Sequence, residues 1–168
     1  MPSAPASFDH LAEAHRPEIL AYLIRLLGDQ HDAEDACQET FLRAYRAFNR
    51  LAAGTNARAW LYKIATNIAF NTWKRRRREK ARSVDMDWET LPFDSTSVLN
   101  RREDLRAVAR ALETLPPKQR AALMQRQFQG LSYAEIALTL GCSEEAARAN
   151  VYQAIKKLRE MLVDREEA

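Results

Sequence analysis

Glycine and proline are scarce in this chain, and their scarcity constrains its fold more than any other feature: 168 residues include only 4 Gly and 6 Pro. Sandwiches and barrels of short strands need many tight turns, which draw on both residues. β-Branched residues are also sparse beside Ala, Leu, Arg and Glu, which are mostly good helix formers. The sequence therefore predicts an all-α protein with room for one domain or two small ones.

Charge is distributed unevenly along the chain, although the formal net charge is only +3. Residues 51–83 hold nine Lys or Arg against one Glu, a net charge of +8. Residues 84–99 hold four acids and no base, a net charge of −4. Such a concentration of positive charge indicates contact with a polyanion. A solvated helix end is the alternative, and the basic run alone does not decide between them.

Apolar spacing and capping residues predict the helices. They are expected over residues 8–27, 33–49, 56–78, 101–115, 117–128, 132–140 and 143–163. Pro17 is expected to kink the first helix or to start a second segment, and Asp32 to cap the next helix. The buried stripe of the third helix is expected to comprise Ala57, Leu61, Ile64, Ile68 and Thr72. Residues 81–98 lose the periodicity, which favours an interdomain linker.

The sharpest local pattern lies in residues 132–157. A short helix with Ala137 is followed by a turn with Gly141 and a longer helix, which is typical of a helix-turn-helix. The inner face of the longer helix is expected to hold Ala147, Val151, Ala154 and Leu158, and the outer face Glu145, Arg148, Ala149, Tyr152, Gln153 and Lys156. In the major groove, Arg pairs with guanine and Gln with adenine. An ordinary helical hairpin with a charged face is the alternative.

The helix expected over 56–78 ends in five consecutive bases, residues 74–78. One polar stripe at helical spacing comprises Lys63, Asn67, Asn71, Lys74 and Arg78. Its amides and cations could hold bases and phosphates respectively. Aromatic residues that could stack on unpaired bases are Trp60, Tyr62, Phe70 and Trp73. Aromatic residues at this spacing are more often core, and a nuclear-import signal is another interpretation of the basic run.

The helix expected over 33–49 has a polar face opposite its apolar stripe, formed by Asp35, Gln38, Leu42, Tyr45 and Arg46. An exposed Leu and Tyr among acids and amides favour a protein interface. A solvated face with two incidental apolar residues is the alternative.

The order of these patterns resembles that of bacterial sigma factors. The chain reads DAEDACQETFLRAYR at 32–46, ARAWLYKIATNIAFNTWKRRRR at 57–78, then the acidic segment, LPPKQRAAL at 115–123 and GLSYAEIALTLGCSEEAARANVYQAIKKLRE at 130–160. The resemblance is to the extracytoplasmic-function (ECF) group of the sigma-70 family, and it covers residues 8–163. It implies region two over 1–80 and region four over 100–168, two small helical domains joined by a flexible acidic linker over 81–99.

The resemblance also implies a function: a transcription initiation factor that binds RNA polymerase core, recognises −10 and −35 promoter elements and opens the DNA. It assigns contact with the clamp helices of the largest polymerase subunits to Asp35, Gln38, Glu39, Leu42 and Tyr45. It assigns −10 recognition and melting to Trp60, Tyr62, Lys63, Asn67, Asn71, Lys74, Arg76 and Arg77. It assigns −35 recognition to Arg148, Ala149, Tyr152, Gln153 and Lys156. An anti-sigma factor is an expected further partner, because most relatives are held by one.

The start of the expected recognition helix departs from the family pattern. Glu145-Ala146-Ala147-Arg148 replaces the usual Gly-Thr-Val-Lys, and Asn150 and Gln153 stand where Arg is frequent. The affinity for the −35 element, or its sequence, is therefore expected to differ from the common pattern.

Other classes of protein fit less well. His10 and His15 do not share a helical face for a metal, and the chain has neither a phosphate-binding Gly-rich loop nor a nucleophile elbow. We therefore expect no enzyme, catalytic residue, metal site or cofactor. Cys37 and Cys142 fit buried thiols in a reducing cytosol, and the lack of a long apolar run predicts a cytoplasmic protein without membrane insertion. The remaining alternative is a two-domain helix-turn-helix regulator with an N-terminal sensing domain.

Overall fold

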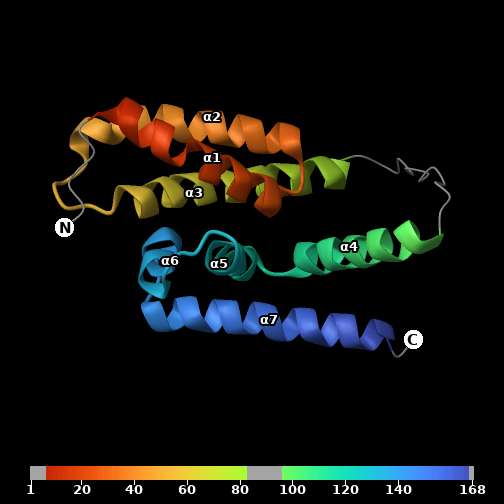
Figure 1. Cartoon of the computed structure of the whole chain (residues 1–168). Coiled ribbons are helices and arrows are strands. Elements are labelled where there is room, and N and C mark those ends of the chain that lie inside the picture. The colour runs from red at the N-terminus through yellow and green to blue at the C-terminus, as the bar shows by residue number, and fades with distance from the viewer. Residues whose placement is uncertain (1–6, 83–95, 167–168) are drawn as a thin grey trace.

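The computed structural model describes residues 7–82 and 96–166, with side chains described over 7–82 and 102–164, and all regular elements in these ranges are helical (Figure 1). They are α1 (Phe8–Leu27), α2 (Gln30–Ala47), the 3-10 helix η1 (Phe48–Arg50), α3 (Ala57–Arg82), α4 (Thr96–Thr114), α5 (Pro117–Gln127), α6 (Tyr133–Leu140) and α7 (Glu144–Glu166). The predicted all-α fold is confirmed. None of the helices in these ranges is long and apolar enough to cross a membrane.

The corner between α1 and α2 differs from the prediction. Gly28 adopts a φ of 69°, and its N–H donates to Ile24 O at 2.9 Å, which closes α1. The next helix starts at once, because the Asp29 carboxylate accepts from Asp32 N at 2.8 Å. The prediction that Asp32 is the cap was therefore wrong: Asp29 is the N-cap. Pro17 lies inside α1, which continues through it, so no second segment starts there.

The helix α3 is buried on two sides rather than along one stripe. Leu61, Ile68 and Thr72 are buried as predicted, whereas Ala57 and Ile64 are only partly buried. Further buried positions are Ala59, Tyr62, Ala65, Thr66 and Ala69. The helix packs against α1 and α2 on one side and against α6 on another, so a single-stripe prediction describes only part of its buried surface.

One hydrophobic core runs through both halves of the chain. In Figure 1, α1, α2 and α3 lie together and α4 to α7 lie beneath them, with α5 and α6 next to the first group. The core joins Leu26 and Leu61 of the first half to Leu131 and Ile136 of the second. The linker expected over 81–99 falls mostly on residues 83–95, outside the described residues, and its two flanks belong to α3 and α4.

A buried polar contact crosses the same boundary. The hydroxyls of Tyr22 in α1 and Thr66 in α3 lie 2.8 Å apart, and Gln125 of α5 donates to Tyr22 Oη at 2.9 Å. Burial raises the pKa of Tyr22 to about 12, so its hydroxyl stays protonated and able to donate. Because a buried polar group must find a partner in the fold, this contact fixes how the two halves sit against each other.

Candidate nucleic-acid interface

The helix-turn-helix is held by caps at both of its helices. Ser132 Oγ accepts from Glu135 N at 3.1 Å and Glu135 Oε2 accepts from Ser132 N at 2.8 Å, so the two residues form a capping box. Gly141 ends α6 with a φ of 62°, and Ser143 Oγ accepts from Ala146 N to open α7. These caps set the angle at which α7 leaves the turn.

The two faces of α7 match the prediction. Ala147, Val151 and Ala154 are buried and Leu158 is partly buried. The exposed face comprises Glu145, Arg148, Ala149, Tyr152, Gln153 and Lys156, the set that includes every expected −35 residue. All six residues of this face are exposed, so a partner can reach them in the packed arrangement.

The guanidinium of Arg148 is held in place at the start of this face. Its Nη2 donates to Glu144 Oε1 at 3.1 Å, and its Cζ lies 4.5 Å from the centroid of the Tyr133 ring. Arg126 of α5 approaches the same ring at 4.4 Å. The sequence analysis missed Arg126 and Tyr133, because nothing in the spacing of α5 and α6 shows that both lie beside the first turn of α7.

The polar stripe of α3 is exposed along its length. Its exposed members are Lys63, Asn67, Asn71, Lys74 and Arg78, and Arg77 is exposed beside them. Asn71 also lines a hollow of about 370 Å³ between α2 and α3, together with Asp35 and Glu39. Amide groups and cations thus follow one another along α3, next to carboxylates of α2.

Two aromatic members of the expected −10 set are withdrawn from the surface: Tyr62 is buried and Trp60 is partly buried. Tyr62 is fully buried: its hydroxyl donates to Glu18 Oε2 and accepts from Gln129 Nε2, both at 2.9 Å. Burial raises the pKa of Tyr62 above its ordinary value. The alternative that these aromatic residues belong to the core therefore holds for Tyr62 in this arrangement, because α3 is covered on the side where Tyr62 lies. Trp60 is partly buried and packs against the core.

Arg76, a third residue of the expected −10 set, stabilises the corner between α1 and α2. Its guanidinium pairs with the Asp32 carboxylate, with Nε 2.7 Å from Oδ2, and donates to Leu27 O at 2.8 Å. The side chain is 30% exposed. In this arrangement Arg76 is therefore engaged within the protein, whereas its neighbours Lys74 and Arg77 are exposed.

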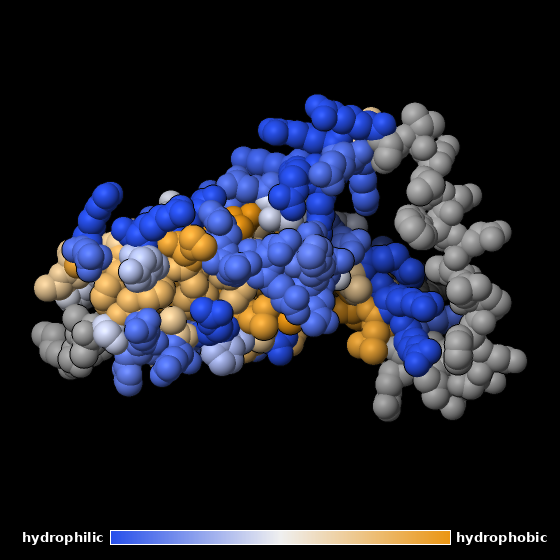
Figure 2. All heavy atoms as spheres, turned by 90° about the horizontal axis from the view of Figure 1, so that it is seen from above, coloured by the Kyte–Doolittle hydropathy of each residue, from blue (hydrophilic) through white to orange (hydrophobic). Residues whose placement is uncertain are grey.

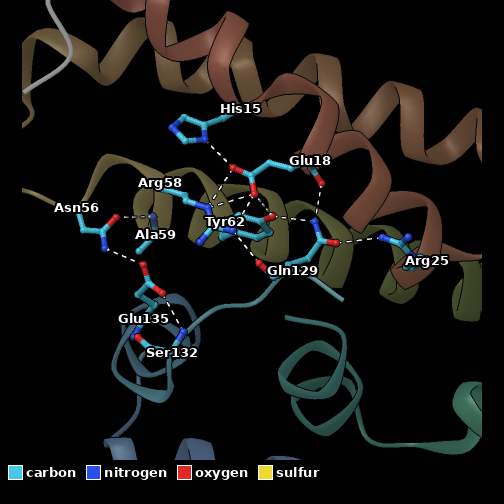
Figure 3. A network of polar contacts seen from close by, with 10 residues as sticks. All are labelled: His15, Glu18, Arg25, Asn56, Arg58, Ala59, Tyr62, Gln129, Ser132 and Glu135. Atoms are coloured by element: carbon cyan, nitrogen blue, oxygen red, sulfur yellow. Dashed lines mark hydrogen bonds and ion pairs between the residues drawn. The ribbon is translucent and has the colours of Figure 1, made fainter. Parts of the chain in front are cut away.

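Glu18 is the centre of a polar network that joins α1, α3 and the segment after α5 (Figure 3). Arg58 Nη2 donates to Glu18 Oε2 at 2.8 Å and to Gln129 O at 2.7 Å, and His15 Nδ1 lies 2.6 Å from Glu18 Oε1. Burial acts to raise the pKa of Glu18, but hydrogen bonds from Arg58, His15 and Tyr62 outweigh it and hold that pKa below its ordinary value. A second bridge joins Asn56 Nδ2 to Glu135 Oε1 at 3.1 Å.

The expected polymerase-binding face lies on α2, away from the second half of the chain. Asp35, Gln38, Leu42 and Tyr45 are exposed and Glu39 is partly exposed. Leu42 is 40% and Tyr45 66% exposed, although the Phe8 ring packs edge-on against Tyr45 at 5.3 Å. Figure 2 looks onto the side where α2 lies and shows hydrophobic patches among hydrophilic side chains, the broadest toward the left. Exposed apolar side chains in such a setting are typical of a protein interface.

Comparison with known proteins decides the family. The Sigma-70 region 2 model matches residues 11–79, which hold α1 to α3, and the Sigma-70, region 4 model matches residues 105–158, which hold the helix-turn-helix. The chain belongs to the sigma-70 family of RNA polymerase sigma factors. The curated relatives place it in the ECF group of that family, as the sequence predicted.

Relatives match almost the whole sigma chain. This chain is 34% identical over 163 residues to the ECF RNA polymerase sigma factor SigE of Mycolicibacterium smegmatis. The match covers 95% of this chain but only 63% of SigE. The chain is 32% identical to the RNA polymerase sigma factor CarQ of Myxococcus xanthus, with 95% of this chain and 91% of CarQ covered. Among solved structures, the sigma factor RpoE of Bartonella quintana in complex with the anti-sigma factor NepR has a TM-score of 0.71 at 28% identity, covering 92% of this chain and 96% of RpoE.

Proposed function

We propose that this chain is a transcription initiation factor that binds RNA polymerase core, recognises −10 and −35 promoter elements and opens the DNA. One observation carries the proposal: a single chain combines a region 2 helix with an exposed stripe of amides and cations and a region 4 helix-turn-helix with an open outer face. The chain lends recognition to the polymerase and has no catalytic role of its own. The alternative of an N-terminal sensing domain is not retained, because residues 11–79 match sigma region 2.

The −35 element is read by the outer face of α7 in this proposal. Arg148 and Gln153 have side chains that pair with guanine and adenine edges, and Tyr152 and Lys156 lie beside them on the same exposed face. The contact of Arg148 with Glu144 and Tyr133 fixes its guanidinium before DNA arrives, which lowers the entropy lost on binding.

The −10 element is met by the exposed stripe of α3. Asn67 and Asn71 present amides to unpaired bases, while Lys63, Lys74 and Arg77 neutralise phosphates. Trp60, Tyr62 and Arg76 are engaged in the packed arrangement. Glu18, Asp32 and Leu27, which hold Tyr62 and Arg76, belong to region 2 itself, so these two side chains meet DNA only if region 2 also rearranges.

The packed arrangement is too short to reach both elements at once. Elements centred near positions −10 and −35 are about 25 base pairs apart, which is about 85 Å along B-form DNA at 3.4 Å per base pair. In the structure, Asn56 of region 2 and Glu135 of region 4 are directly hydrogen-bonded. The two regions must therefore separate when the chain acts on a promoter.

Core polymerase binds the exposed face of α2 in this proposal, through Asp35, Gln38, Glu39, Leu42 and Tyr45. Further support for a second partner comes from the RpoE relative, whose solved structure is a complex with the anti-sigma factor NepR. An anti-sigma factor that binds the packed form would keep this chain from polymerase. Action on RNA polymerase implies, as part of this proposal, that the chain acts in the cytoplasm.

Run-off transcription with purified core polymerase tests the proposal. On genomic fragments, core enzyme with the chain should yield discrete transcripts that neither component yields alone, and their start sites should share −10 and −35 sequences. Failure of the chain to copurify with core polymerase, together with the absence of such transcripts, would contradict it.

A further inference from the structure

A cavity of about 220 Å³ lies where the end of α3 meets the end of α4 and the start of α5. Among the described residues, the charged side chains that line it are Arg76, Arg77, Lys80 and Arg120, against one carboxylate, Glu113. Arg76 is already paired with Asp32, so an anion site here depends on Arg77 and Arg120. Both halves of the chain contribute to this set, so the cavity exists only in the packed arrangement. The excess of positive charge marks it as a place where an anion would be stabilised.

Arg120 is the most deeply buried of these cations, with only 7% of its surface exposed. Its Nη2 donates to Arg25 O at 3.4 Å and its Cζ lies 5.3 Å from the Trp73 ring centroid. Its Nε has no hydrogen-bond partner within the described part of the chain. Burial lowers the pKa of Arg120, Glu113 acts to raise it and Arg76 lowers it further, so the charge is incompletely compensated. A buried charge without a full set of partners is costly, which an anion in the cavity would relieve.

The N-terminus of α5 adds to the same field. Pro117 occupies the first turn and lines the cavity, and the N-cap residue Pro116 gives the helix no side-chain cap. A helix start carries partial positive charge, which favours anions nearby. Pro116 and Pro117 have no N–H, so this start contributes its dipole and no backbone donor to the cavity. Three features therefore coincide here: clustered cations, a buried arginine with an Nε that lacks a partner, and the positive end of a helix dipole.

We propose that this cavity binds a small phosphate-bearing anion of the pyrophosphate, triphosphate or nucleotide class. A second hollow of about 470 Å³ adjoins it and shares Trp73, Arg77 and Pro117. Phe70 stacks on Trp73 there, at 5.5 Å between centroids, so the second hollow offers an aromatic and apolar surface beside the phosphate site. A nucleobase could lie in it while the phosphates occupy the cationic cavity.

Binding would connect the two halves of the chain. An anion held by Arg77 of α3 and Arg120 of α5 bridges region 2 and region 4, and it stabilises the packed arrangement over any separated one. The same anion competes with DNA phosphates for Arg77. Anion binding and promoter binding are therefore mutually exclusive.

Isothermal titration calorimetry of the full chain with sodium triphosphate and with adenosine triphosphate, at fixed ionic strength, tests the inference. Saturable binding of one anion per chain is expected. Arg120→Met should weaken it about tenfold or more, because one buried charge-assisted contact is lost. Glu113→Gln should tighten it about threefold, because the one carboxylate among the described lining residues is neutralised. Arg159→Gln, which removes an exposed cation elsewhere, is the matched control and should change the affinity less than about twofold.

Each outcome decides for or against the site. Equal weakening by Arg120→Met and Arg159→Gln would show diffuse charge attraction and overturn the proposal, as would the absence of saturable binding to both anions. If Arg120→Met does not fold, an unchanged affinity in Glu113→Gln overturns it by itself. Tighter binding of adenosine triphosphate than of triphosphate supports the site and assigns a nucleotide, whereas equal binding supports it and assigns an inorganic polyphosphate.

Discussion

Single residues at the boundary between regions 2 and 4 have roles that differ from those of their sequence neighbours. Glu18 accepts hydrogen bonds from two side chains of α3, Arg58 and Tyr62, and it lies on α1. Arg58 also donates to the backbone oxygen of Gln129, which belongs to region 4. A single carboxylate thus couples three segments that are 40 or more residues apart in the chain.

Replacement of Glu18 by Gln should destabilise the protein by about 1–3 kcal/mol at pH 7, because charge-assisted hydrogen bonds to a half-buried group are lost. The folded-state pKa of Glu18 is lowered from 4.5, so its contribution is present above pH 4.5 and is lost as the pH falls through the lower folded value. Urea unfolding of wild type and Glu18→Gln at pH 7 and at pH 3 measures this. The difference in the free energy of unfolding between wild type and Glu18→Gln should be smaller at pH 3 than at pH 7.

Glu13→Gln is the control for this prediction, since Glu13 is an exposed carboxylate on the same helix. It should change the free energy of unfolding by less than about 0.5 kcal/mol at either pH. A Glu18→Gln effect as small as that of Glu13→Gln would show that the network contributes nothing to stability.

At the outer face of α7, which we propose reads the −35 element, Arg148→Ala should weaken promoter binding by about 1–3 kcal/mol and relax the preference at one −35 position. The physical reason is the loss of a guanidinium that Glu144 and Tyr133 already hold in place. Titration of holoenzyme onto promoters with single −35 substitutions measures both effects, and Arg106→Ala on α4 is the control for lost charge. An unchanged −35 preference in Arg148→Ala would remove Arg148 from the reading face.

The helices themselves show what sequence can and cannot predict. The faces of α7 follow from spacing alone, because that helix is covered on one side. The helix α3 is covered on two sides, so Tyr62 of the expected base-stacking set is buried. Asp29 rather than Asp32 caps α2, because the helix begins at Gln30 and Asp32 lies inside its first turn. The Asp32 carboxylate instead pairs with Arg76, 44 residues away. Residues that act through such distant partners give no local signal.

The exposed face of α2 carries its own prediction. The double variant Gln38→Ala, Leu42→Ala should weaken binding to core polymerase about tenfold or more while the helical circular dichroism stays unchanged, since interface anchors carry most of the binding energy. Surface plasmon resonance against immobilised core polymerase measures the affinity. Glu13→Ala, at an exposed position on α1, is the control and should bind nearly normally. Normal binding by the double variant would place the polymerase contact elsewhere.

On the scale of the whole molecule, the two sigma regions form one packed unit. The contacts that hold it are polar as well as apolar: Gln125 reaches Tyr22 and Thr66, and Glu135 accepts from Asn56. Sequence patterns predicted both regions but not this packing, because it depends on pairs of residues 59 to 103 positions apart. The same contacts oppose the separation that a −10 and −35 promoter demands.

Energy transfer between dyes on the two regions, followed while transcription proceeds, tests the central claim most directly. Cysteines at Glu13 on α1 and Arg159 on α7, both exposed and outside the proposed polymerase-binding face, accept the dyes in a variant whose Cys37 and Cys142 are replaced by Ala. The account predicts efficient transfer in the free chain and its loss in the transcribing promoter complex, where the regions lie about 85 Å apart. Efficient transfer that persists in a complex making promoter-specific transcripts would contradict it.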